Sequence, residues 1–307
     1  MVMATPLLLL LPLLGAVAAP RTLLEQPLDL YVAAAGSDGP GNNCTSRTAP
    51  CATPAAAYHY VQRYIDIGGL SVTVHLLSNI TVAAGWSFEG PLVGGAGPGS
   101  FVIDGGSTTS SGTTSASRTE GAAAAALPVR TVRLVESSAA GTVGLFFAND
   151  GAAFTLANMQ LASPLANGYT VLVADGAVHV SGLTFLENRC SLDVCGGRSV
   201  IAQTGPLTWH AANFTFGAVA EDHGVIDLSG PITMRGTPTF GSQREGAFAQ
   251  ADLGGMIDGS GAVVSGGARG RRYVASTNGI VFTGGTGNAS FFPGDVAGTV
   301  GGGGIYQ

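Results

Sequence analysis

Three consecutive stretches of the chain follow one pattern: LFFANDGAAFTLANMQLAS at 145–163, TVLVADGAVHVSGLTFLE at 170–187 and SVIAQTGPLTWHAANFTF at 199–216. Each contains a short apolar run, a turn with Gly, and a second run in which apolar and polar residues alternate. Alternation with a period of two is typical of β-strands. Repetition of such units is typical of solenoids, so these stretches predict a solenoid built from β-strands.

Glycines recur with nearly constant spacing along the same part of the chain. They are Gly151, Gly176, Gly205, Gly230, Gly254 and Gly279, separated by 25, 29, 25, 24 and 25 residues. We predict an all-β fold, a right-handed single-stranded parallel β-helix in which these glycines occupy the corners. The alternative is a β-sandwich, whose hairpins would favour two-residue turns such as Asn-Gly, and few of these are present.

Apolar residues at matching places in successive units are expected to stack inside the solenoid. The predicted stacks run from Val178, Val180, Leu183 and Phe185 to Leu207, Trp209, Phe214 and Phe216, and then to Ile232, Met234 and Phe240. One coil cannot bury its own inward side chains, whereas stacked coils share one apolar column.

The chain divides into four segments. Residues 1–20 form an apolar N-terminal segment, 21–70 an N-terminal strand, disulfide loop and capping helix, 71–290 the coils, and 291–307 a Gly-rich tail. A low-complexity loop at 107–126 interrupts the coils. The helix is predicted within ATPAAAYHYVQRYID at 52–66, with Ala57, Tyr60, Val61 and Tyr64 on one face.

The first twenty residues, MVMATPLLLLLPLLGAVAAP, contain an apolar run followed by Ala16-Val17-Ala18. This pattern predicts a cleaved signal peptide, and a retained apolar tail is the alternative, since no Lys or Arg precedes the run. No later stretch reaches the roughly 18 consecutive apolar residues of a membrane span, so we expect no stable span. The expected location is outside the cell or on its surface.

The four cysteines fall into two local pairs, Cys44 with Cys51 and Cys190 with Cys195. We predict two disulfides that close short loops, with free buried thiols as the alternative. A metal site would more often show a two-residue spacing with clustered histidines, so no metal site is expected.

The charge of the chain argues against a nucleic-acid partner. Its formal net charge is −6, and Arg269, Arg271 and Arg272 form the one local basic cluster, which is too short for such a surface.

Few residues are candidates for a functional site. Asp150 and Asp175 each precede a corner Gly and are expected one coil apart, although Asp before Gly is also common turn chemistry. Asp222 belongs to the acidic cluster Glu221-Asp222-His223, which also suits a polar loop. Trp209 is a candidate platform for a sugar ring, and the alternating pattern favours a place in the core instead. We predict no catalytic residue and no cofactor.

Five stretches resemble a known superfamily. They are RTLLEQPLDLYV at 21–32, DLYVAAAGSDGPGNN at 29–43, CATPAAAYHYVQRYID at 51–66, GTPTFGSQREGAFAQADLGGMID at 236–258, and FFPGDVAGTVGGGGIYQ at 291–307. They are similar to right-handed β-helix proteins of the pectate-lyase-like superfamily, and especially to phage tail and prophage β-helix proteins of GC-rich alphaproteobacteria. The resemblance implies a rigid rod that contacts a cell-surface polysaccharide, a homotrimeric assembly, and a place in the virion.

Three functions follow as hypotheses. The first is a non-enzymatic recognition protein of phage-tail type that binds a cell-surface glycan. The second is a secreted polysaccharide lyase or glycoside hydrolase, which paired acids on stacked coils would favour. The third is an exported, adhesin-like surface protein, which the leader and the paired cysteines favour.

Overall fold

A computed structural model describes residues 20–106, 129–134, 144–165, 168–241, 246–285 and 287–307. The predicted leader, apart from Pro20, and the predicted low-complexity loop at 107–126 lie outside these ranges.

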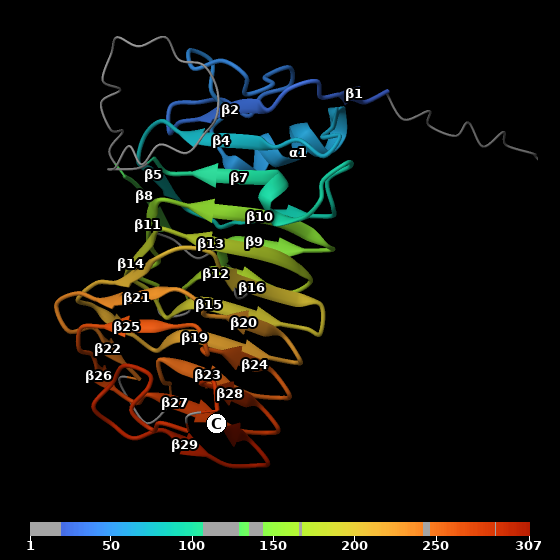
Figure 1. The fold of residues 1–307 in the computed structure, drawn as a ribbon. Coiled ribbons are helices and arrows are strands. Elements are labelled where there is room, and N and C mark those ends of the chain that lie inside the picture. The colour runs from blue at the N-terminus through green and yellow to red at the C-terminus, as the bar shows by residue number, and fades with distance from the viewer. Residues whose placement is uncertain (1–19, 107–128, 135–143, 166–167, 242–245, 286) are drawn as a thin grey trace, which may run out of the picture.

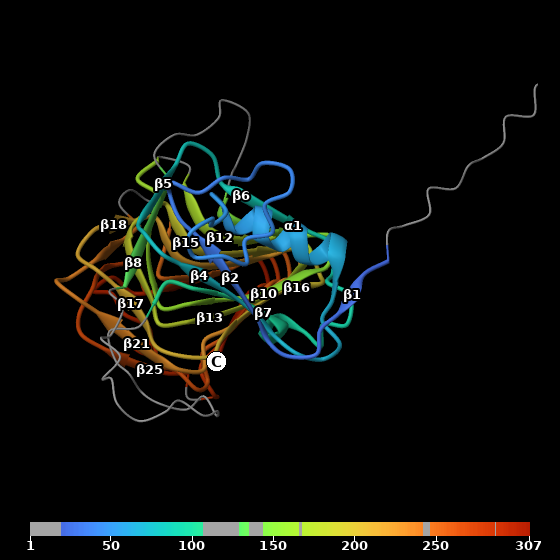
Figure 2. The same ribbon diagram turned by 90° about the horizontal axis from the view of Figure 1, so that it is seen from above.

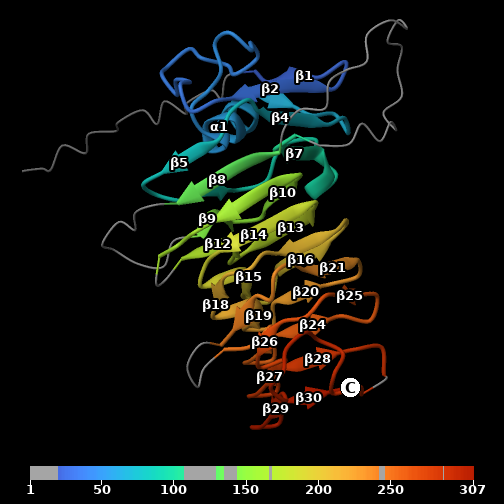
Figure 3. The same ribbon diagram turned by 90° about the vertical axis from the view of Figure 1, so that its left-hand side faces the viewer.

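The chain is a right-handed parallel β-helix, as the repeat predicts (Figure 1). Each coil passes in turn through a ten-stranded, a seven-stranded and an eight-stranded sheet, and every pairing between named strands is parallel. Successive strands of each sheet step down one axis from the N-terminal to the C-terminal end (Figure 3).

Three long sheets hold most of the strands, which pair within each sheet in chain order. The ten-stranded sheet contains β2 (Leu28–Val32), β4 (Val72–Leu76), β7 (Phe101–Asp104), β10 (Ala152–Ala157), β13 (Gly176–Ser181), β16 (Ser199–Gln203), β20 (Val225–Asp227), β24 (Met256–Asp258), β28 (Ile280–Phe282) and β30 (Ile305–Tyr306). The seven-stranded sheet contains β5 (Ile80–Val82), β8 (Arg130–Leu134), β11 (Met159–Ala162), β14 (Leu183–Glu187), β17 (Leu207–Trp209), β21 (Pro231–Met234) and β25 (Val263–Ser265). The eight-stranded sheet contains β6 (Trp86–Glu89), β9 (Gly144–Asn149), β12 (Tyr169–Val173), β15 (Cys190–Cys195), β19 (Phe216–Glu221), β23 (Ala249–Ala251), β27 (Tyr273–Ala275) and β29 (Thr299–Val300).

Two short sheets lie beside the long ones. They are β1 (Thr22–Leu23) with β3 (Ile65–Asp66), and β18 (Asn213–Phe214) with β22 (Thr239–Phe240) and β26 (Arg269–Gly270).

The core is a column of inward side chains stacked from coil to coil. Leu207 pairs with Ile232 and Trp209 with Met234, as predicted. In the preceding coil Leu183 pairs with Leu207 and Phe185 with Trp209, in place of the predicted Phe214 and Phe216. All of the paired side chains are buried. The backbone register therefore places large apolar groups directly above one another, and burial of each one stabilises the fold by about 1.5–3 kcal/mol.

Other predicted stacks are wrong in register. Val178 pairs with Ile201, not with Leu207, because each coil supplies a separate strand to the ten-stranded sheet. Phe216 pairs with Cys190 in the eight-stranded sheet and is only half-buried.

The regularly spaced glycines occupy two different corners. Four of them, Gly151, Gly176, Gly254 and Gly279, lie at the entry to the ten-stranded sheet, whereas Gly205 and Gly230 precede strands of the seven-stranded sheet. Gly151 has φ +81°, which L side chains rarely adopt. At Gly176 a Cβ would overlap the carbonyl oxygen of Ala152 in the preceding coil.

A single α-helix among the described residues, α1 (Pro54–Tyr64), covers the N-terminal end of the coils (Figure 2). Thr53 caps it by accepting a hydrogen bond from the Ala56 amide. The prediction is correct for Ala57 and Val61, which are buried, but Tyr58 replaces Tyr60 and Tyr64 as the buried tyrosine. Its hydroxyl donates to the Gly90 carbonyl at 2.7 Å, and its ring contacts Phe88 and Phe101.

The 3₁₀-helix η1 (Pro98–Ser100) precedes β7. Within the described part of the chain, no helix is long and apolar enough to cross a bilayer.

One of the two predicted disulfides is present. Cys44 and Cys51 are bonded, with their Cα atoms 5.0 Å apart. The predicted bond between Cys190 and Cys195 is wrong, because both residues lie in the single strand β15 and both thiols are free. Five residue steps of extended chain separate their Cα atoms by about 16 Å, whereas a disulfide spans at most about 7 Å.

Alkylation of the folded, non-reduced protein tests this arrangement of cysteines. Cys195, which is half-buried, is expected to react slowly, and Cys190, which is buried, only after denaturation. Peptide mapping by mass spectrometry should recover Cys44 and Cys51 as one cross-linked pair. A cross-link between Cys190 and Cys195 would contradict the strand assignment of β15.

Truncation of a core residue tests the stacked register. Phe185→Ala is expected to destabilise the protein by about 3–5 kcal/mol, because it leaves a cavity between Leu161 and Trp209 in neighbouring coils. Thr184→Ala, in the same strand but half-exposed, is the matched control and should change stability little. Guanidinium unfolding of both variants measures the difference, and equal midpoints would contradict the inward placement of Phe185.

Candidate binding cleft

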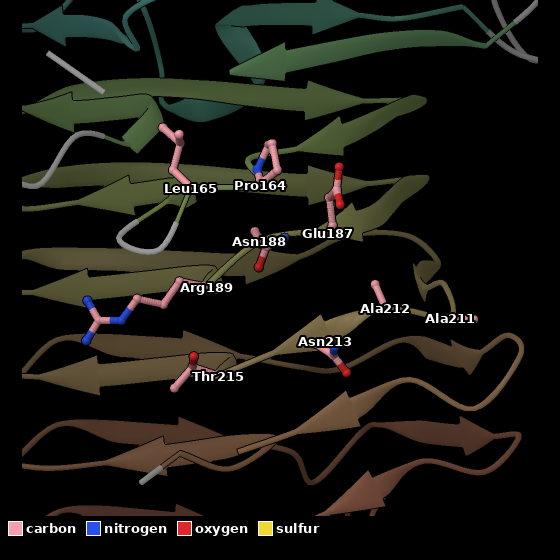
Figure 4. Close-up of a pocket in the computed structure, with 9 residues that line it drawn as sticks. All are labelled: Pro164, Leu165, Glu187, Asn188, Arg189, Ala211, Ala212, Asn213 and Thr215. Atoms are coloured by element: carbon pink, nitrogen blue, oxygen red, sulfur yellow. The ribbon is translucent and has the colours of Figure 1, made fainter. Parts of the chain in front are cut away.

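A cleft of about 410 Å³ lies at the corner between the seven-stranded and the eight-stranded sheets (Figure 4). Three successive coils form it, and their corners differ in length. Residues 163–168 connect β11 to β12, only 188–189 connect β14 to β15, and 210–215 connect β17 to β19. Because the middle corner is the shortest, it leaves a recess between its two longer neighbours.

The lining combines polar and apolar side chains. The residues are Pro164, Leu165, Glu187, Asn188, Arg189, Ala211, Ala212, Asn213 and Thr215. Backbone hydrogen bonds join the three corners: the Arg189 amide donates to the Gly168 carbonyl at 2.9 Å, and the Thr215 amide donates to the Arg189 carbonyl at 2.9 Å. The cleft is therefore built on the rigid ladder of the solenoid, and such support suits a binding site.

A chain of hydrogen bonds fixes the orientation of the Asn188 amide. Trp209 Nε1 donates to Ser191 Oγ at 2.9 Å, and Ser191 Oγ donates to Asn188 Oδ1 at 3.1 Å. An indole N–H can only donate and an amide oxygen can only accept, so the Ser191 hydroxyl accepts from Trp209 and donates its own hydrogen to Asn188 Oδ1. This leaves Asn188 Nδ2 as a buried donor that has no partner within the described structure.

An unpaired buried donor has an energetic cost. Asn188 is only 4% exposed, and an unsatisfied polar group of this kind costs about 1–3 kcal/mol. A ligand oxygen that accepts from Nδ2 would recover much of this energy. Nδ2 itself is covered, whereas Asn213 is exposed at the rim of the cleft.

Trp209 is fully buried and does not form an exposed platform. Its ring packs against Phe185 and Phe248, at centroid distances of 4.9 and 5.2 Å. Its part in the site is indirect, because it holds Ser191, which in turn orients Asn188.

Both charged groups of the cleft have partners. Glu187 Oε1 forms an ion pair with Arg133 Nη2 at 2.9 Å. Arg189 Nη1 donates to the Tyr169 hydroxyl at 2.7 Å. The Arg189 guanidinium also lies 5.5 Å from the Tyr169 ring centroid and 5.8 Å from that of Phe216, within cation–π range.

Arg189 separates the cleft from a pair of carboxyl groups on the outer face of the eight-stranded sheet. Asp193 pairs with Val219, and Glu221 lies two residues further along that adjacent strand. Strand geometry therefore places the Cα atoms of Asp193 and Glu221 about 8 Å apart. Burial and then the neighbouring Glu221 raise the pKa of Asp193 to about 7, although Arg189 opposes this shift. Burial, followed by Asp252 and Asp222, raises the pKa of Glu221.

The other acidic candidates lie apart from the cleft lining. Asp150 and Asp175 occupy stacked turns, where the Gly151 amide donates to the Asp175 carbonyl at 2.9 Å. Asp150 and Asp222 both have positive φ, at 52° and 48°, which is tolerated by Asp in turns. Asp222 is exposed, and it raises the pKa values of Glu221 and Cys195, although burial has the largest effect on both.

Asn188, Arg189 and Asp193 were not predicted from the sequence. The signal for Asn188 and Arg189 was the difference in corner length between successive coils, which becomes visible only after each strand has been assigned to its sheet. Asp193 lies within β15, and its role depends on burial. Within the described ranges, no group of three or more His, Cys, Asp or Glu side chains is arranged to hold a metal ion.

The stability of the protein should depend on the ionisation of Asp193. The pKa of Asp193 is raised from 3.8 to about 7 on folding, so between these pH values the folded state binds more protons than the unfolded state. Stability contributed by the neutral carboxyl is therefore present below pH 4 and is lost as the pH rises to about 7, by at most about 1.4 kcal/mol per pH unit.

Asp193→Asn removes this titration. The free energy of unfolding of this variant should exceed that of the native protein by more at pH 8 than at pH 5. Denaturant unfolding at both pH values measures the difference. Asp193→Glu keeps a carboxyl group and is the control, which should retain a dependence on pH. An Asp193→Asn curve parallel to that of the native protein would contradict the buried placement of this carboxyl group.

Comparison with known proteins found no matching family model, curated protein or solved structure.

Proposed function

We propose that this protein is a non-enzymatic recognition β-helix that holds a glycan of a cell surface in the cleft around Asn188. The observation that carries the proposal is the buried Asn188 Nδ2 donor, which has no protein partner within the described residues and whose orientation is fixed by Ser191. A sugar hydroxyl or ring oxygen is a suitable acceptor for an amide donor.

The composition of the cleft supports a sugar ligand. Asn188 and Asn213 provide amides, and Pro164, Leu165 and Ala212 provide apolar surface for the C–H groups of a sugar ring. Its volume of about 410 Å³ lies within the usual range for small-ligand pockets. The lateral position on a rigid solenoid allows a long polysaccharide to pass across the corner while one residue enters the cleft.

We propose that this recognition protein is a rod that is exposed on a cell surface or forms part of a phage tail. The Cys44–Cys51 disulfide supports an oxidising environment. The apolar run at 1–20 supports export. The resemblance of segments 29–43 and 51–66 to phage tail β-helix proteins supports the alternative setting in a virion, in which a homotrimer is expected.

Hydrolysis of the bound glycan is a second candidate function. The observation that favours it is the Asp193 carboxyl group, whose pKa of about 7 suits a general acid near neutral pH. Glu221 lies diagonally across the adjacent strand, with its Cα about 8 Å from that of Asp193. Glycoside hydrolases use two such carboxyl groups, one on either side of the scissile bond. The lyase reaction is less well supported, since it requires a free base and a uronic acid substrate.

Binding to immobilised polysaccharides tests the proposal. The full chain is incubated with a panel of bacterial and plant polysaccharides, and bound protein and new reducing ends are both measured. We expect binding without new ends. New reducing ends that Asp193→Asn abolishes would replace the recognition function by hydrolysis.

Variants of the cleft connect binding to the site. Asn188→Ala and Asn213→Ala should each weaken binding about tenfold, as expected for loss of one hydrogen bond of about 1.4 kcal/mol. Gln250→Ala, in β23 away from the cleft lining, is the control and should bind like the native protein. Equal affinities of all three variants would exclude the cleft as the binding site.

A further inference from the structure

We infer that the cleft selects a neutral, hydroxyl-rich sugar residue and rejects acidic sugars, and that Glu187 determines this selection. The inference rests on the proposed function, since it specifies the class of glycan that the same cleft would bind.

Arg133 is already neutralised at the edge of the cleft. Its Nη2 atom lies 2.9 Å from Glu187 Oε1, and the two side chains are 48% and 42% exposed. Glu187 itself lines the cleft. An anionic sugar that approached Arg133 would therefore have to displace a carboxylate that is already in place.

Arg189, the second cationic group near the cleft, also has partners within the protein. Its guanidinium donates to the Tyr169 hydroxyl at 2.7 Å and lies near the rings of Tyr169 and Phe216. It also faces Asp193 and Glu221, whose pKa values it lowers against the larger effect of burial. A carboxylate or sulfate group would compete with these contacts and would meet two carboxyl groups beyond them.

Neutral amides are the groups that remain for a ligand. Asn188 Nδ2 is an unpaired donor among the described residues, and Asn213 places a neutral amide at the exposed rim. Such amides recognise hydroxyl, ring and acetamido oxygens and do not compensate a negative charge. The cleft therefore matches neutral hexose, pentose or N-acetylhexosamine units. Specificity arises from repulsion of the acidic sugar as well as from attraction of the neutral one.

The experiment compares oligosaccharides of equal length by isothermal titration calorimetry on the full chain. The neutral probes are cellohexaose, mannohexaose, xylohexaose and N-acetylated chitohexaose, and the acidic probes are hexamers of galacturonate and guluronate. We expect at least one neutral probe to bind and the acidic probes to bind at least tenfold more weakly.

Glu187→Gln is the decisive variant. It removes the carboxylate from the cleft and leaves the Arg133 guanidinium without its ion-pair partner. This variant should gain at least tenfold in its affinity for an acidic probe relative to its affinity for the neutral probe, because the carboxylate that repels the acidic sugar is gone. Glu25→Gln, which removes an exposed carboxylate far along the chain, is the charge-matched control and should not gain acidic binding.

The outcomes separate the two proposals. Preferential binding of an acidic probe by the native protein, reduced by Asn188→Ala, would overturn this inference and leave the proposed function intact. Neutral binding without a gain of acidic binding in Glu187→Gln would overturn the role of Glu187. Absence of binding by every probe and by the polysaccharide panel would overturn the proposed function itself.

Discussion

Parallel pairing between successive coils is the interaction on which the rest of this structure depends. Each strand inside a long sheet forms its hydrogen bonds with the coils above and below, so no coil satisfies its backbone or buries its inward side chains alone. The pairing of Leu183 with Leu207 and Ile232 follows from this register, as does the pairing of Phe185 with Trp209. The helix α1 completes the arrangement by covering the N-terminal end of the column.

The same constraint leaves the corners free to vary. Strand positions must match from coil to coil, but the connection between two strands can contain two residues at 188–189 or six at 163–168 and 210–215. A short corner between two long ones produces the cleft without any change in the sheets. Functional side chains are therefore expected at the corners, whose length is free to vary between coils.

The sequence was sufficient for the fold because stacking requires a repeat, and a repeat is visible in the chain. It predicted the coil, the capping helix and the core residues Leu183 and Phe185. The pairing of Cys190 with Cys195 failed because closeness in sequence does not mean closeness in space along one extended strand. Asn188 and Asp193 were missed because their roles depend on corner lengths and on burial of an outward face, and neither follows from a two-residue period.

Trp209 links the core to the cleft and explains why the site is coupled to the fold. A buried indole N–H needs an acceptor, and in this protein the acceptor is Ser191 Oγ. That hydroxyl accepts from Trp209 and donates its own hydrogen to Asn188 Oδ1, which can only accept, so the amide donor is left unpaired among the described residues. The polarity of the cleft is thus set by a hydrogen bond that the core itself requires. A change at Trp209 would therefore alter the cleft by releasing the orientation of Asn188, even though Trp209 does not line it.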